Sequence, residues 1–184
     1  CLGPKSEKMM RISCLDISRA YFNAKLDDGA TTYAQLPPED PDAGVLCAEL
    51  PRHMYGTRAA AYGWQEECSS TLVAELNFVQ GVAPPCLCRH SSRAIVVPVH
   101  CDDFTAAGSK FDLDWYEAEM KKHYELTTQP RLGPAPDDGK EAVVLNRIIR
   151  WCEHGLEYEA GPRQVEELLT ECGLTGANPV ATPG

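Results

Sequence analysis

Three acidic residues that lie far apart in the chain carry the clearest chemical signal in the sequence. Asp16 ends a short run of alternating residues, and Asp102 and Asp103 stand side by side between two apolar runs. Mg²⁺ prefers oxygen ligands and is commonly held by a few carboxylates together with substrate phosphates. Two such ions can activate an attacking hydroxyl and stabilise a departing pyrophosphate. Three acids at one sheet edge would therefore suit metal-dependent transfer of a phosphorus-containing group.

The two adjacent acids cannot play the same part. Neighbouring residues on a regular strand face opposite ways, so Asp102 and Asp103 can both join Asp16 only if a turn lies there. We expect Asp102 to be the bridging ligand beside Asp16, with Asp103 nearer the rim. The alternative is an acid pair that only caps or solvates a turn, which the spacing leaves open.

The elements that position these acids follow from apolar periodicity and turn residues. Strands are expected at 10–16, 31–36, 45–50, 86–89, 94–99 and 104–107, with a further strand pair at 142–151 and 156–159. Helices are expected at 57–78, at 111–124 with Ser109 as N-cap, and at 162–172 with Gly173 as the stop. The order predicts an α+β fold, an antiparallel sheet with helices packed on one face.

The long helix expected at 57–78 has a predicted buried face and a predicted end. The long helix should bury a face with spacings of three and four residues, made by Ala60, Trp64, Cys68, Thr71, Leu72 and Leu76. Gly81 and the pair Pro84 and Pro85 should terminate it.

Two segments around the acids resemble polymerase motifs of the reverse transcriptases. LDISRAYFNAKL (15–26) is similar to the first motif, in which an aspartate precedes an aromatic by five positions, here Asp16 and Tyr21. PVHCDDFTAAG (98–108) resembles the Tyr-x-Asp-Asp hairpin, with His100 where Tyr is usual. The resemblance implies a palm-like sheet.

Two further segments resemble the copia-type retrotransposon branch of that family. In ELPRHMYGTRAAAYGWQ (49–65), the matching residues are Tyr55, Gly56, Arg58 and Trp64, whereas Thr57 and Ala59 replace the usual Leu and Gln. CGLTGANPVATPG (172–184) looks like the domain end that precedes a linker to ribonuclease H. The four segments stand in the family's order.

The resemblance implies an RNA-directed DNA polymerase that transfers nucleotides from dNTPs to a primer 3′-hydroxyl. It assigns the catalytic and metal-binding roles to Asp16, Asp102 and Asp103, with the backbone carbonyl of Ile17 as an extra ligand. The implied cofactor is a pair of Mg²⁺ ions, or Mn²⁺ in their place.

The same resemblance implies substrate contacts for three other residues. Tyr21 would lie beneath the incoming sugar and exclude a 2′-hydroxyl, although a core aromatic after a turn is the plain alternative. Gly56 would allow the backbone to approach the nascent base pair closely, because it has no Cβ. Arg58 would meet a phosphate, unless it is only a solvated charge at a helix start.

The resemblance also sets the expected organisation. We expect one reverse transcriptase domain over 1–184, with a palm core at about 10–126, a thumb-like hairpin and helix at about 140–174, and the start of a linker at 175–184. The chain has no initiator Met, and little precedes the first motif where the family carries basic fingers, so we expect an N-terminally truncated Pol polyprotein segment of a transposable element. The implied partners are an RNA or DNA template with its primer, dNTPs, and the ribonuclease H and integrase regions of that polyprotein.

Composition limits the other possibilities. The 184 residues are 43% hydrophobic and 24% charged, with no apolar run that could span a membrane and no signal-peptide pattern, so no membrane partner is expected. The nine Cys include no CxxC pair, which favours reduced thiols inside a cell. The resemblance to a retrotransposon enzyme implies the cytoplasm, in a virus-like particle, or the nucleus. The spacing of Cys86, Cys88, His90, His100 and Cys101 does not fit a familiar zinc module.

The net charge of −10 argues against nucleic-acid binding, because proteins that bind nucleic acid usually carry a basic surface. Either the basic parts lie elsewhere, or the acids gather in a metal site and on surfaces that face away from the groove. A second hypothesis therefore stays open, a catalytically inactive or decayed retroelement fragment that serves only as a folded interaction module.

Overall fold

The computed structural model describes residues 9–26 and 29–178, and a six-stranded antiparallel sheet forms its centre. In spatial order the strands are β4 (Phe78–Gln80), β5 (Leu87–His90), β6 (Val96–His100), β7 (Asp103–Gly108), β1 (Arg11–Ile17) and β8 (Leu126–Thr128). Strands far apart in the sequence thus meet in the middle of the sheet, where β1 pairs with β7. The expected strands around the acids are confirmed, whereas the three-residue strands β4 and β8 were not predicted.

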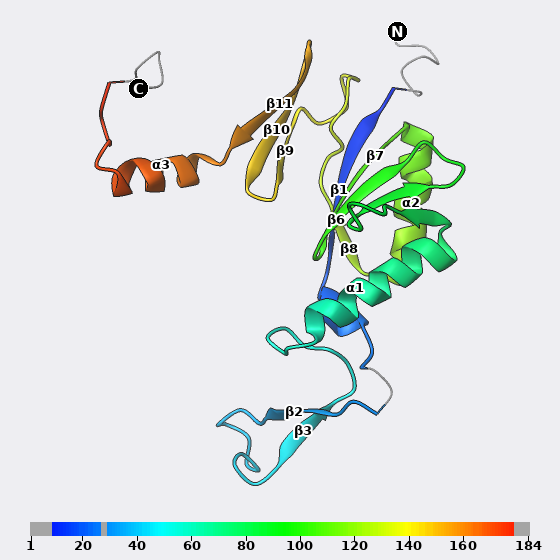
Figure 1. Ribbon diagram of the computed structural model, residues 1–184, viewed down its shortest axis with the longest axis vertical. Helices are drawn as coiled ribbons and strands as arrows, with labels where there is room; N and C mark the ends of the chain where they lie inside the picture. The colour runs from blue at the N-terminus through cyan, green and yellow to red at the C-terminus, as the bar shows by residue number, and fades with distance from the viewer. Residues whose placement is uncertain (1–8, 27–28, 179–184) are drawn as a thin grey trace.

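Two helices cover one face of this sheet, as the α+β prediction requires (Figure 1). They are α1 (Ala60–Ser70), continued by the π-helical turn η3 (Thr71–Glu75), and α2 (Lys110–His123). All members of the predicted face of the long helix are buried: Ala60, Trp64, Cys68, Thr71, Leu72 and Leu76. Of these, Trp64, Cys68, Leu72 and Leu76 share one core with Leu113, Tyr116 and Met120 of α2 and with Leu15 and Phe104 of the sheet.

The start of α2 is the one that the sequence predicts. Ser109 precedes it with extended backbone, and its Oγ accepts a hydrogen bond from Asp112 N at 3.2 Å. A hydroxyl in this position satisfies an amide that has no partner within the helix. The helix ends at His123.

The predicted end of the long helix is wrong. Helical structure stops at Glu75, Asn77 adopts a φ of 59°, and Phe78 already belongs to β4. Asn tolerates the left-handed conformation that closes a helix, and Phe78 is more stable paired with His90 across the sheet and buried in the core. Gly81 lies instead in the turn between β4 and β5, where its amide donates to the Leu87 carbonyl at 2.8 Å.

The predicted strand at 142–151 is two strands. β9 (Glu141–Val144) and β10 (Arg147–Cys152) are joined through Leu145 and Asn146, whose φ values are 49° and 60°. Two consecutive left-handed residues form the tight loop that suits the twist of a hairpin. With β11 (Gly155–Ala160) they make a three-stranded antiparallel sheet, followed by the predicted helix α3 (Pro162–Glu171).

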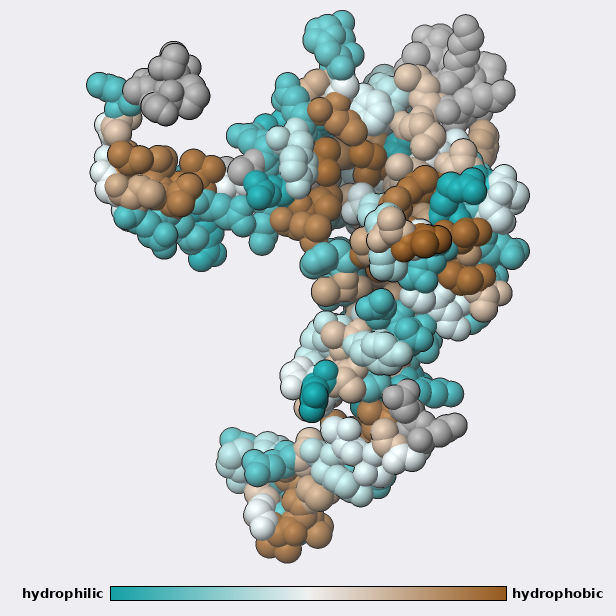
Figure 2. All heavy atoms as spheres, in the orientation of Figure 1, coloured by the Kyte–Doolittle hydropathy of each residue, from teal (hydrophilic) through white to brown (hydrophobic). Residues whose placement is uncertain are grey.

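The smaller units extend from the central sheet in different directions (Figure 1). The three-stranded sheet and α3 lie on one side, and the hairpin of β2 (Thr32–Gln35) and β3 (Cys47–Leu50) lies at the far end beyond α1. Figure 2 shows one hydrophobic and one hydrophilic side of α3, and Val165, Leu168 and Leu169 are exposed there. In the described residues, no helix is long and apolar enough to cross a membrane.

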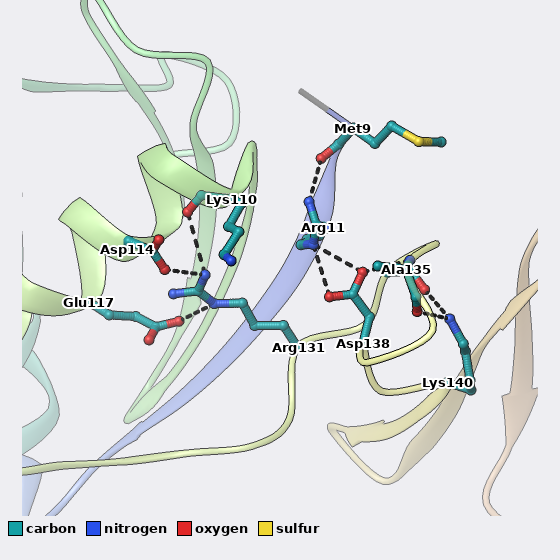
Figure 3. A network of polar contacts seen from close by, with 10 residues as sticks. Met9, Arg11, Lys110, Asp114, Glu117, Arg131, Ala135, Asp138 and Lys140 are labelled. Atoms are coloured by element: carbon teal, nitrogen blue, oxygen red, sulfur yellow. Dashed lines mark hydrogen bonds and ion pairs between the residues drawn. The ribbon is translucent and has the colours of Figure 1, made fainter. Parts of the chain in front are cut away.

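Ion pairs fasten the loop between β8 and β9 to the central sheet (Figure 3). Arg11 Nε of β1 donates to both Asp138 carboxylate oxygens, at 2.9 and 3.0 Å, and Ala135 N donates to Asp138 Oδ2 at 2.8 Å. Arg131 Nε donates to Glu117 Oε1 of α2 at 2.7 Å. The loop is therefore attached both to β1 and to α2.

Candidate active site

The first and third predicted acids face each other across two neighbouring strands. Asp16, near the end of β1, is paired in register with Asp103, the first residue of β7. Side chains at directly opposed positions have Cβ atoms roughly 4.5–5.5 Å apart. The preceding pair, Leu15 and Phe104, is buried beneath the helices, so the alternation of the strands places Asp16 and Asp103 on the opposite, open face.

Asp102 lies in the hairpin loop rather than on the strand. The pair His100 and Asp103 closes a two-residue loop, Cys101 and Asp102, in which Cys101 has a φ of 54°. The expectation that Asp102 stands beside Asp16 thus differs from the observed register, because the turn occupies 101–102 and the strand begins at 103. Which carboxylate bridges the ions stays a prediction.

Two hydrogen bonds fix this loop. Ile17 N at the end of β1 donates to the Asp102 carbonyl at 3.0 Å, and Trp64 Nε1 of α1 donates to the Cys101 carbonyl at 2.7 Å. Trp64 is only 2% exposed and contacts Phe104 edge-on, with ring centroids 6.4 Å apart. The resemblance singled out Trp64 but not this bond, which the sequence does not signal. For the Ile17 carbonyl, ligation stays a prediction.

The three carboxylates repel one another. Burial raises the pKa of Asp103, the charges of Asp102 and Asp16 raise it further, and His100 opposes the shift. In the described part of the chain, none of the ion pairs involves any of these three acids. The cluster is therefore a place where a cation would be stabilised.

The side chains of the candidate site could supply only part of the ligand shell of a Mg²⁺ ion. Among residues 9–26 and 29–178, no group of three His, Cys, Asp or Glu side chains is arranged to hold a metal ion. Mg²⁺ in nucleotide-using sites, however, usually takes one or two carboxylates and completes its shell with waters and phosphates. The opposed pair Asp16 and Asp103, beside Asp102, meets that requirement.

A small cavity of about 80 Å³ lies beside the opposed acids. Its lining includes Asp16, Asp103 and Gln129, together with Val143 and Val144 of β9. The three-stranded sheet therefore reaches the acid-bearing face, an arrangement that sequence reasoning missed because nothing local to β9 indicates it.

Tyr21 lies next to the hairpin loop. It belongs to the short helix η2 (Ala20–Asn23) and is half-buried against the core. Burial raises the pKa of its hydroxyl, and the neighbouring Cys101 and Asp102 raise it further. Tyr21 thus packs against the core, as expected for a core aromatic after a turn, and it also borders the site.

Gly56 and Arg58 lie on the segment that leads into α1. Gly56 has a φ of 88°, which favours glycine, and a Cβ built there would meet no atom within 4 Å. Its backbone conformation therefore explains the glycine, and a close approach to a base pair stays a prediction. Arg58 is exposed just before Ala59, the residue that precedes α1.

Comparison with known proteins identifies the family of this chain. A family model described as reverse transcriptase (RNA-dependent DNA polymerase) matches residues 4–184. A search of curated proteins found no match. The matched range contains all the residues of the candidate site.

Proposed function

We propose that this chain, which belongs to the reverse transcriptase (RNA-dependent DNA polymerase) family, is an active RNA-directed DNA polymerase. The observation that carries the proposal is the register that opposes Asp16 and Asp103 on the open face of the sheet, next to Asp102. A family match alone would leave the site undefined, whereas this pairing joins carboxylates from two distant motifs.

The substrates in this proposal are a primer annealed to an RNA or DNA template, and dNTPs. Asp16, Asp102 and Asp103 would hold Mg²⁺ or Mn²⁺, with the Ile17 carbonyl as a further ligand. When bound, two such ions favour deprotonation of the primer 3′-hydroxyl and neutralise charge on the leaving pyrophosphate.

The other residues of the site position these groups. The bonds from Ile17 N and Trp64 Nε1 hold the hairpin loop, and a displacement of about 1 Å between reacting groups can cost about 10²-fold in rate. Tyr21 borders the space next to Asp102, where it would contact the sugar of the incoming nucleotide. Arg58 is exposed and would be free to reach a phosphate.

The copia-type assignment is part of the proposal. It rests on the segments 49–65 and 172–184, of which 179–184 lie outside the described residues. It brings with it the ribonuclease H and integrase regions of a Pol polyprotein as partners.

Primer extension tests the proposal. The full chain, an RNA template and a DNA primer are incubated with dNTPs and Mg²⁺, and Asp16→Asn and Asp103→Asn are compared with the unaltered protein. Each substitution should lower incorporation by about 10²-fold or more, the scale of losing one transition-state charge contact. Asp137→Asn, an exposed acid in the loop before β9, is the matched control. Equal incorporation by Asp103→Asn and the unaltered chain would remove Asp103 from the chemistry.

A further inference from the structure

Three aromatic rings gather beside the hairpin loop, and Tyr55 has no part in the proposed chemistry. Tyr55 stacks on Tyr21 with ring centroids 4.3 Å apart and an interplanar angle of 28°, and it contacts Phe22 at 5.9 Å. Tyr55 is 44% exposed and Phe22 is 43% exposed. Burial in the core therefore does not explain where the Tyr55 ring lies.

The backbone turn that carries Tyr55 has a defined shape. Thr57 N donates to the Met54 carbonyl at 3.1 Å, and Thr57 Oγ1 donates to the same oxygen at 2.8 Å. Between them stand Tyr55 and Gly56, and the φ of 88° at Gly56 is one that glycine adopts without strain. The turn thus fixes the direction in which Tyr55 leaves the backbone.

The turn is also tied to the segment that carries Tyr21. His53 N donates to the Ala24 carbonyl at 3.0 Å, and Arg52 Nη1 donates to the Asn23 carbonyl at 2.7 Å, directly after Tyr21 and Phe22. The buried His53 ring occupies the space above Gly63 of α1, where an added Cβ would lie 2.1 Å from Nε2. The turn that carries Tyr55 and the segment that carries Tyr21 are therefore hydrogen-bonded to each other.

Tyr21 needs such a support on its outer side. Together with Trp64 and Cys101 it lines a cavity of about 330 Å³ between α1 and the sheet, so part of its ring has open space beside it. A side chain next to open space can move between rotamers unless another group holds it. Tyr55 is the ring that lies in stacked contact with it.

We propose that Tyr55 is a positioning residue that holds Tyr21 in place and thereby sets the discrimination between deoxyribonucleotides and ribonucleotides. This inference rests on the proposed function and adds a specificity role for a residue that touches neither the metals nor the reacting atoms. A ribose differs from a deoxyribose by one hydroxyl. A ring that excludes this hydroxyl must therefore be displaced by much less than the size of an oxygen atom. Stacking on Tyr55 supplies that constraint.

Nucleotide binding without turnover tests the inference. The full chain is mixed with Mg²⁺ and an RNA template whose DNA primer ends in a dideoxynucleotide, so that no bond can form, and the Kd values of dATP and ATP are measured. These two ligands differ only at the 2′ position. Tyr55→Leu should lower the preference for dATP by about two- to tenfold, the range that a stacked aromatic pair supplies. Tyr55→Phe, which keeps the ring, should retain the preference.

Two comparisons separate positioning from other roles. Tyr62→Leu alters an exposed tyrosine on α1 and should change neither Kd. If Tyr55 acts through Tyr21, the double variant Tyr21→Ala with Tyr55→Leu should show the same preference as Tyr21→Ala alone, because the supported ring is gone. Equal melting temperatures of the single variants would show that the fold is intact.

The possible failures are distinguishable. An unchanged preference in Tyr55→Leu, or additive losses in the double variant, overturns the positioning role and leaves the polymerase proposal standing. An unaltered chain that binds neither nucleotide in the primer-template complex overturns the proposed function, and this inference with it.

Discussion

Ionisation of Asp103 works against folding, because burial and the charges of Asp102 and Asp16 raise its pKa above the ordinary 3.8. The folded chain therefore binds this proton more tightly than the unfolded chain does. Stability falls as the pH rises from about 3.8 through the raised value, and the penalty is fully present above that value. At pH 7 the ionised carboxylate thus lowers the free energy of unfolding.

We therefore expect Asp103→Asn to raise the melting temperature at pH 7, in the absence of divalent ions, by about 1–3 °C. Opposed like charges on neighbouring strands destabilise by roughly 0.2–1 kcal/mol, which corresponds to that shift in a chain of this size. At pH 3.5 the gain should largely vanish, because Asp103 is then mostly protonated in both states. Thermal unfolding at the two pH values measures this, and a lower melting temperature at pH 7 would contradict it.

At the scale of residues, the sequence predicts which acids come together but not their register. Asp16, Asp102 and Asp103 were predicted from residue type and from the resemblance. The turn between the two strands was predicted but too wide: the expected strands 94–99 and 104–107 leave 100–103 for it, whereas His100 and Asp103 are paired and only Cys101 and Asp102 form the loop. Cys is not a residue that marks the left-handed position that closes it. The shift of one residue exchanges which acid stands opposite Asp16.

The loop between β8 and β9 is attached to β1 by one largely buried ion pair. The side chains of Arg11 and Asp138 are only 6% and 10% exposed, and Asp138 also accepts a hydrogen bond from Ala135 N. Removing one charge leaves the other in a poorly solvated position. The loop leads into β9, which borders the cavity next to the acids.

Asp138→Asn should accordingly lower the free energy of unfolding by about 3–5 kcal/mol, measured by urea denaturation. Asp114→Asn is the matched control, because Asp114 pairs with Arg131 but is 51% exposed. An exposed pair contributes about 1 kcal/mol or less. Similar losses in the two variants would show that burial of the Arg11 pair does not matter.

At the scale of elements, the sequence was sufficient to predict the helices with strong apolar periodicity but not the shortest strands. The buried face of α1 and η3 and the Ser109 cap of α2 follow from side-chain spacing and capping chemistry. The strands β4 and β8 have three residues each, too few to show an alternation. The division of β9 from β10 was missed because its turn contains Leu145 and Asn146, without Gly or Pro.

Across the whole molecule, the acidic excess is not confined to the site. Exposed acids are carried by β11 and α3, which lie away from α1 and α2 (Figure 1): Glu157, Glu159, Glu166, Glu167 and Glu171. Because β9 of the same three-stranded sheet borders the cavity next to Asp16 and Asp103, the explanation that the excess acids behind the net charge of −10 face away from the groove stays a prediction. The sequence alone could not place these acids, since the three-stranded sheet is joined to the central sheet by long-range contacts, namely the ion pairs of Arg11 and Arg131 and the packing of Ala142 with Cys14 and Leu132.

The response of the whole chain to Mg²⁺ separates a working site from an inert fold. A ligand that binds only the folded state stabilises it, by about 1.4 kcal/mol at ten times its Kd. We expect 10 mM Mg²⁺ to raise the melting temperature by roughly 3–6 °C if its Kd is about 1 mM, relative to NaCl of equal ionic strength. The double variant Asp16→Asn with Asp103→Asn should melt higher than the unaltered chain without Mg²⁺ and should lose the response, because it lacks both the repulsion and the ligands. An equal Mg²⁺ shift in both proteins would place the ion elsewhere, and no shift in the unaltered chain would favour the inactive interaction module.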